Sequence, residues 1–159
     1  METGNKQAMS RRGFFQKVGV TGVAAIATGS ALTALPRSAS AAVDSIVADK
    51  LGAGSVTMAK VNIDTPSSAD NGALVRMPVS VDHPMEPGNY IESVVVLVDN
   101  NPQPFICQYD FLPEAGKAEF ECRIKMAKTS KVRAIAKSNS GKLYGFEKEI
   151  QVAAGGCVG

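Results

Sequence analysis

The 159-residue sequence has very few of the side chains on which most enzyme active sites depend. It contains one histidine and three cysteines. The histidine, His83, stands between Asp82 and Pro84, a context typical of a solvated turn residue. A protein zinc site needs three or four good ligands, and these residues do not supply them. We therefore predict that the chain has no catalytic residue, no metal ion and no cofactor of its own.

Short motifs for nucleotide, haem and thiol redox chemistry are absent as well. The sequence has no Cys-x-x-Cys pair, no haem-attachment motif, no Gly-x-Gly-x-x-Gly and no phosphate-binding loop. Its carboxylates are scattered, as is typical of solvated surface charges. These absences disfavour an autonomous enzyme.

The first 41 residues have the features of a cleaved export signal. Arg11 and Arg12 form a twin-arginine pair, an apolar stretch covers residues 18–35, and Ala39-Ser40-Ala41 is a small-residue cleavage motif. The alternative is a membrane anchor, but the stretch is short and rich in Gly, Ala, Ser and Thr. We expect residues 1–41 to be removed, leaving no stable membrane anchor. The mature protein would then be periplasmic, exported by the twin-arginine route.

Cleavage would also change the charge of the protein. The complete sequence has a net charge of +2, but residues 1–41 hold five of its 17 basic residues and one of its 15 acidic residues. The remainder therefore carries a net charge of about −2. Nucleic acid then has no electrostatic argument as a partner.

After residue 41, one helical pattern is followed by patterns of period two. Apolar residues recur at helical intervals from Val43 to Leu51, and Gly52 ends the pattern. Seven segments that alternate or are rich in β-branched residues, each bounded by turn residues, predict strands at 56–63, 73–81, 93–98, 104–111, 118–126, 131–138 and 143–152. Residues 42–152 are thus predicted to form a mainly β, antiparallel β-sandwich domain with a short N-terminal helix. The polar segment 64–72 is expected to be a surface connection.

One predicted strand is apolar on both faces. The run from Val94 to Val98 has no polar residue at either parity. Two interpretations remain open: a central strand covered on both sides within the fold, or a strand whose outer face meets a partner subunit.

Two cysteines fall in register if residues 114–117 form a hairpin turn. The pairs would be Phe105 with Ile124, Cys107 with Cys122, and Tyr109 with Phe120. Directly opposed residues of an antiparallel pair have Cα atoms about 4.5–5.5 Å apart, within the range of a disulfide. Because an exported protein meets an oxidising environment, we predict a Cys107–Cys122 disulfide. The alternative is two buried free cysteines that act as small hydrophobic residues.

The third cysteine, Cys157, stands in the terminal sequence AAGGCVG. Gly155 and Gly156 admit most backbone conformations, so we predict that residues 153–159 form a flexible C-terminal arm. An arm from Ala153 to Cys157 spans at most about 16 Å, enough to enter a cleft on another protein. An exposed thiol without a nearby base is only weakly activated. Such a thiol is typical of a carrier whose cargo is attached and removed by partner enzymes.

A second interpretation of Cys157 is an intermolecular bond. An unpaired cysteine in a secreted protein indicates either a reactive thiol or a link between chains. The alternative function is therefore a non-catalytic binding or assembly module joined through a Cys157 disulfide.

Several features together resemble the SoxY family, the sulfur-carrier subunits of the Sox thiosulfate-oxidation system. They are the twin-arginine signal, the strand pattern, and the stretches 97–102, 131–136, 141–144 and Gly155-Gly156-Cys157. The resemblance implies an immunoglobulin-like sandwich that forms a heterodimer with a SoxZ-like sandwich subunit in the periplasm. Residues Val158 and Gly159 end the chain, whereas the family's usual ending is Gly-Gly-Cys-Gly-Gly. The β-branched Val158 stiffens the backbone and adds bulk beside the thiol.

The resemblance also implies a sequence of reactions on Cys157. A haem-containing sulfur oxidase would join thiosulfate to Cys157 as a cysteine S-thiosulfonate, and a hydrolase would release sulfate. A sulfur dehydrogenase would then oxidise the remaining sulfane sulfur, or the sulfur would be passed elsewhere. The expected function is a periplasmic sulfur carrier that holds a covalent sulfur adduct and catalyses none of these steps itself.

Overall fold

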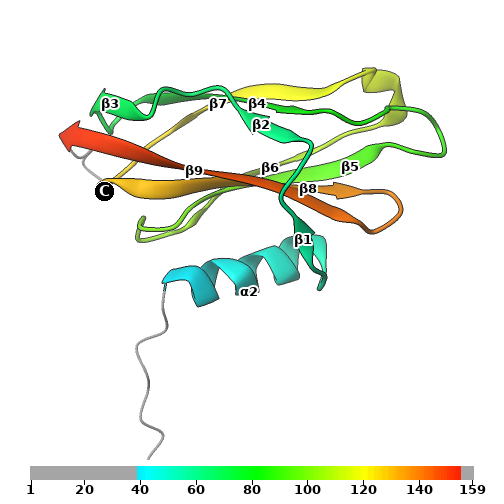
Figure 1. Ribbon diagram of the computed structural model, residues 1–159, viewed down its shortest axis with the longest axis horizontal. Coiled ribbons are helices and arrows are strands. Elements are labelled where there is room, and N and C mark those ends of the chain that lie inside the picture. The colour runs from blue at the N-terminus through cyan, green and yellow to red at the C-terminus, as the bar shows by residue number, and fades with distance from the viewer. Residues whose placement is uncertain (1–38, 155–159) are drawn as a thin grey trace, which may run out of the picture. The chain divides into compact units, whose positions relative to one another are not determined.

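The alternating segments of the sequence form two β-sheets that face each other, in a computed structural model that describes residues 39–154 (Figure 1). The larger sheet contains, in spatial order, β1 (Val56–Thr57), β9 (Leu143–Ala154), β8 (Ser130–Ser138), β5 (Ile91–Val98) and β6 (Phe105–Asp110), with β3 (Ser68–Asn71) also paired to β9. The smaller sheet contains β2 (Val61–Ile63), β4 (Val75–Val81) and β7 (Ala118–Ile124). This is the predicted mainly β, immunoglobulin-like sandwich. Only β1 and β3 depart from antiparallel pairing, because both run parallel to β9.

The main core lies between the two sheets. Strand β4 alternates strictly, with its odd-numbered residues buried, among them Met77 and Val79. They belong to one hydrophobic cluster with Val94 and Val96 of β5. Complete burial of a valine or methionine side chain contributes about 1.5–3 kcal/mol, so this layer supplies much of the driving force for folding.

The predicted N-terminal helix is confirmed as α2 (Ala39–Leu51), which lies against the outer face of the larger sheet (Figure 1). Val43, Val47 and Leu51 lie on one face of the helix, four residues apart, and form a second hydrophobic cluster with Val95 and Leu97 of β5, among others. After the helix, Gly52 takes a φ of 93°, and its N–H donates to the carbonyl of Ala48 at 3.0 Å.

This helix decides between the two interpretations of the apolar strand. Val94, Val96 and Val98 face the main core, while Val95 and Leu97 lie under α2, and all five are fully buried. The strand is therefore covered on both faces within the chain. The alternative, an outer face that meets a partner subunit, is wrong for this strand.

Two predicted elements around residue 60 differ from the structure. The single strand expected at 56–63 is divided into β1 and β2, which belong to different sheets. Lys60 takes a φ of 66° between them, and the chain crosses there from one sheet to the other. The segment 64–72 was expected to be only a connection, but it contains β3, whose polar side chains are mostly exposed. Strand β3 joins the sheet through its main-chain pairing with β9, and its sequence has no apolar alternation.

The hairpin predicted for residues 105–124 is wrong. Strand β6 pairs with β5 in the larger sheet, and β7 pairs with β4 in the smaller one. The short 3₁₀ helix η1 (Pro113–Ala115) lies in the connection that crosses between the sheets. Each strand pairs with a long apolar strand rather than with the other, so both place their inward side chains on the common core. Because the register shifts between Val96 and Leu97, Phe105 packs with the cluster under α2 instead of sharing the face of Cys107.

No helix between residues 39 and 154 is long and apolar enough to cross a membrane.

Candidate functional site

The strand that leads to Cys157 is held by hydrogen bonds on both of its edges. The ladder between β8 and β9 ends at the pair Ser130 and Ile150. Beyond it, the N–H of Gln151 donates to the carbonyl of Ser67 at 2.8 Å, and the N–H of Val152 donates to Oγ1 of Thr129 at 3.0 Å. Successive N–H groups of a strand point to opposite edges, so these bonds fix β9 from both sides.

The parallel pairing with β3 continues to the end of the described chain. Ser68, Ala69 and Asn71 lie opposite Gln151, Val152 and Ala154. The first two residues of the predicted arm, Ala153 and Ala154, are thus part of β9. The remaining residues of the predicted arm lie outside the described residues: Gly155, Gly156, Cys157, Val158 and Gly159. The structure therefore describes the scaffold of the candidate site as far as Ala154.

A shallow surface pocket lies beside this scaffold. It has a volume of about 320 Å³ and is lined by the facing residues of β3 and β9 together with Thr129. Most of the lining side chains are small or polar, and Asp70 is the one charged residue among them. The last lining residue, Ala153, stands four positions before Cys157 in the sequence.

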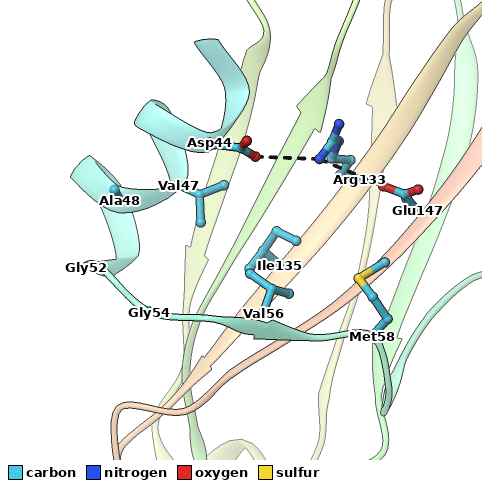
Figure 2. Close-up of a pocket in the computed structure, with 10 residues that line it drawn as sticks. All are labelled: Asp44, Val47, Ala48, Gly52, Gly54, Val56, Met58, Arg133, Ile135 and Glu147. Carbon is cyan, nitrogen blue, oxygen red and sulfur yellow. Dashed lines mark ion pairs between the residues drawn. The ribbon is translucent and has the colours of Figure 1, made fainter. Parts of the chain in front are cut away.

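A second pocket, of about 310 Å³, lies between α2 and the larger sheet (Figure 2). Arg133 of β8 lies between Asp44 of the helix and Glu147 of β9, with Nη1 3.8 Å from a carboxylate oxygen of each. Its closest partner is Asp99, which accepts from Nε at 2.9 Å and from Nη2 at 2.8 Å. Burial opposes the charged form of Arg133, but the hydrogen bonds and charges of the surrounding carboxylates outweigh it and raise the pKa. The cluster joins the helix to three parts of the sheet.

Sequence reasoning did not single out this arginine. Arg133 lies on the same strand face as Ile135, which is buried under α2. The other residues of its parity in β8 are Lys131, Ile135 and Lys137, so the alternation predicts a charged, exposed position and gives no signal that Arg133 lies under the helix.

Cys107 and Cys122 are both free and partly buried, so the predicted disulfide is not formed in this structure. Their thiols nevertheless influence each other's pKa, and both side chains pack against the main core from the edge strands β6 and β7. Next to them, the rings of Tyr109 and Phe120 stack with centroids 4.0 Å apart. The predicted hairpin register does not produce these pairs, because the residues lie on strands of different sheets.

The pKa values of the two thiols are shifted in opposite directions. The hydrogen bond from Cys122 lowers the pKa of Cys107, although burial acts in the opposite direction. The same contact, together with burial, strongly raises the pKa of Cys122. Physically, a thiolate on Cys107 is stabilised by the thiol proton of Cys122, and loss of that second proton would place two negative sulfurs side by side.

His83 lies in the turn after β4, where its Nδ1 is 2.8 Å from the carbonyl oxygen of Pro84. Its ring lies at 5.8 Å from that of Tyr144. Over the described range 39–154, no group of three or more histidine, cysteine, aspartate or glutamate residues is arranged to hold a metal ion.

A family model described as "Sulfur oxidation protein SoxY" matches residues 47–157 of the chain. The chain belongs to the SoxY family. The match to SoxY begins inside α2, includes every described strand and has Cys157 as its last residue. A search of curated protein sequences finds no match.

Solved structures agree with membership of the SoxY family. The sulfur carrier protein SoxY from Chlorobium limicola f thiosulfatophilum matches with a TM-score of 0.60 and 28% identity, covering 69% of this chain and 94% of that one. A superoxide reductase (neelaredoxin) from Ignicoccus hospitalis matches with a TM-score of 0.53 and 22% identity, covering 58% of this chain and 79% of that one. The second likeness concerns the fold alone.

Proposed function

We propose that this SoxY-family chain is a periplasmic sulfur carrier of thiosulfate oxidation that holds its cargo on Cys157. The observation that carries the proposal is the family match, which spans the sandwich and ends at Cys157. The likeness to a sulfur carrier protein from Chlorobium limicola supports it. The twin-arginine pair and the cleavage motif support the periplasmic location.

The arrangement of β9 suits this role. Cys157 is the third residue after Ala154, so the length of the chain allows at most about 10 Å between it and the end of β9. The strand is anchored on both edges up to that point. A partner enzyme would therefore meet the thiol at a defined place on the sandwich, close to the pocket between β3 and β9.

The chemistry on Cys157 would begin with an oxidation. The thiolate and the outer sulfur of thiosulfate form an S–S bond and give up two electrons, which a haem-containing partner oxidase accepts. Hydrolysis of the resulting S-thiosulfonate by a second partner releases sulfate and leaves a persulfide on Cys157. In this scheme, the chain supplies the attachment point, and SoxZ-like, oxidase, hydrolase and dehydrogenase partners supply the rest.

Intact-mass measurement tests the proposal. The wild-type chain, incubated with thiosulfate and the partner oxidase, is expected to gain one thiosulfate, and Cys157→Ser is expected to gain none. Cys122→Ser is the matched control, because it also removes one thiol yet keeps Cys157. An adduct that persists in Cys157→Ser would contradict the proposal.

The same samples address the alternative function, in which Cys157 links two chains. On a non-reducing gel, that function predicts a covalent dimer that is lost in Cys157→Ser. A wild-type chain that forms this dimer and never gains thiosulfate would favour the binding or assembly module.

A further inference from the structure

The thiols of Cys107 and Cys122 can react independently of Cys157. Their strands, β6 and β7, are edge strands of different sheets, so no main-chain ladder ties them to each other. Side chains of the two edges nevertheless pack together, since the rings of Tyr109 and Phe120 stack with centroids 4.0 Å apart. Both cysteines pack against the main core and remain partly exposed. Cys107 lies two residues from Tyr109 and Cys122 two residues from Phe120, so the stacked rings bring the two partly exposed thiols to the same edge, where they are placed to react with each other.

We propose that Cys107 and Cys122 form a redox-active dithiol that low-molecular-weight disulfides oxidise to a disulfide between the two sheets. The acceptable substrates are disulfides small enough to approach the edge beside Tyr109, and oxidised glutathione is one of them. This site goes beyond the carrier function, since it needs neither Cys157 nor a partner enzyme.

The reaction consists of two exchanges. The Cys107 thiolate attacks one sulfur of the incoming disulfide, forms a mixed disulfide and releases the first leaving thiolate. Cys122 then loses its proton and attacks the sulfur of Cys107, which breaks the mixed disulfide and releases the second thiolate. The two protein sulfurs lose two electrons, and the two released thiols carry away those electrons and both protons.

The surroundings assign different roles to the two cysteines. The thiol proton of Cys122 stabilises a thiolate on Cys107, which makes Cys107 the first nucleophile. The Cys122 sulfur lies 3.8 Å from the carbonyl oxygen of Met77, to which its thiol proton can also donate. Cys122 therefore keeps its proton until Cys107 has reacted, and then acts as the resolving thiol.

Closing this pair would have a consequence for the carrier. A free dithiol attacks S–S bonds, and a sulfur adduct on Cys157 of another molecule contains such a bond. Once Cys107 and Cys122 are joined, Cys157 is the remaining thiol among the three cysteines of the chain. Sulfur would then be loaded at one position and would not be removed by a second copy of the protein.

The test uses the full chain with Cys157→Ser, so that failure of the carrier function does not affect it. The reduced protein is treated with oxidised glutathione and analysed by intact mass and peptide mapping. We expect the loss of two hydrogen atoms, a cross-linked Cys107–Cys122 peptide and no lasting glutathione adduct. A stable adduct without the cross-link would overturn the proposal. The proposal would also be overturned if both thiols stay unreacted under conditions that modify Cys157 of the wild type.

Single variants in the same background separate the two roles. With Cys122→Ser, one glutathione is expected to remain on Cys107, because the resolving thiol is missing. With Cys107→Ser, Cys122 is expected to react much more slowly. If either variant fails to fold, alkylation of the parent decides: iodoacetamide is expected to modify Cys107 first, and its rate to rise at a lower pH than is usual for a cysteine. Equal rates at the two cysteines would contradict the assigned roles.

Discussion

Arg133 is a single residue on which several parts of the chain depend. Its side chain is 14% exposed and that of Asp99 is 11% exposed, so the pair is largely removed from water. Asp44 of α2 and Glu147 of β9 lie on the other side of the guanidinium. Loss of one partner of such a pair leaves a desolvated charge, which costs more than the pair itself contributes.

We therefore predict that Arg133→Met lowers the free energy of unfolding by about 3 kcal/mol, because Asp99 is left without its cation. Urea denaturation of the two proteins measures the change. Lys137→Met is the matched control on the same strand, since Lys137 pairs with Glu92 at 3.6 Å but is more exposed. It is expected to cost less than about 1 kcal/mol. Equal losses in the two variants would show that Asp99 does not depend on Arg133.

At the scale of elements, the period of the sequence pattern located the strands but not their partners. The segments predicted at 73–81, 93–98 and 131–138 contain or largely overlap β4, β5 and β8. The turn around residues 113–116 is equally suited to a hairpin and to a crossing between sheets, so the local residues could not decide. Pairing depends on which strand offers the better apolar face, and that contact lies far away in the sequence.

For the candidate site, the sequence predicted the attachment residue but not the strand that supports it. Position and composition were enough to select Cys157, because it stands behind two glycines at the end of the chain. The parallel support from β3 was not predictable, since the pattern of residues 68–71 is polar. The register that was used to pair Cys107 with Cys122 does not occur, because β6 and β7 pair with other strands in different sheets.

Gly145 of β9 stands at a position where the neighbouring side chains leave no room for a Cβ. Strand β1 runs parallel to β9 beside this position, and a Cβ there would lie 2.6 Å from Cγ1 of Val56 and 2.8 Å from Cδ1 of Ile135. Val56 is β-branched and has little freedom to move aside. We predict that Gly145→Ala displaces β1 and lowers the free energy of unfolding by about 1–3 kcal/mol.

Thermal or urea unfolding checks this prediction against Gly88→Ala. A Cβ at Gly88 would meet nothing within 4 Å, so this control is expected to change stability by less than about 0.5 kcal/mol. If the two alanine variants were equally stable, β1 would not be held against β9 as the structure has it.

At the scale of the whole molecule, the fold and the proposed cargo site occupy separate parts of the chain. Both hydrophobic clusters lie within residues 39–154, as do all the strand ladders of the structure. We predict that a chain ending at Ala154 unfolds at the same urea concentration as the full chain but gains no thiosulfate in the presence of the partner oxidase. A marked loss of stability in the shortened chain would show that the last five residues support the fold.

Strand β9 also has a consequence for how the protein is made. It is the last strand to be synthesised, yet it lies inside the larger sheet, between β1 and β8. A chain that ends before residue 143 lacks this strand, so β1 and β8 have no strand between them and the larger sheet is incomplete. A transport route that accepts only folded proteins would reject such fragments. Under the proposed twin-arginine export, translation through β9, almost to the carboxyl terminus, would thus be a condition for delivery of the chain that carries the terminal thiol.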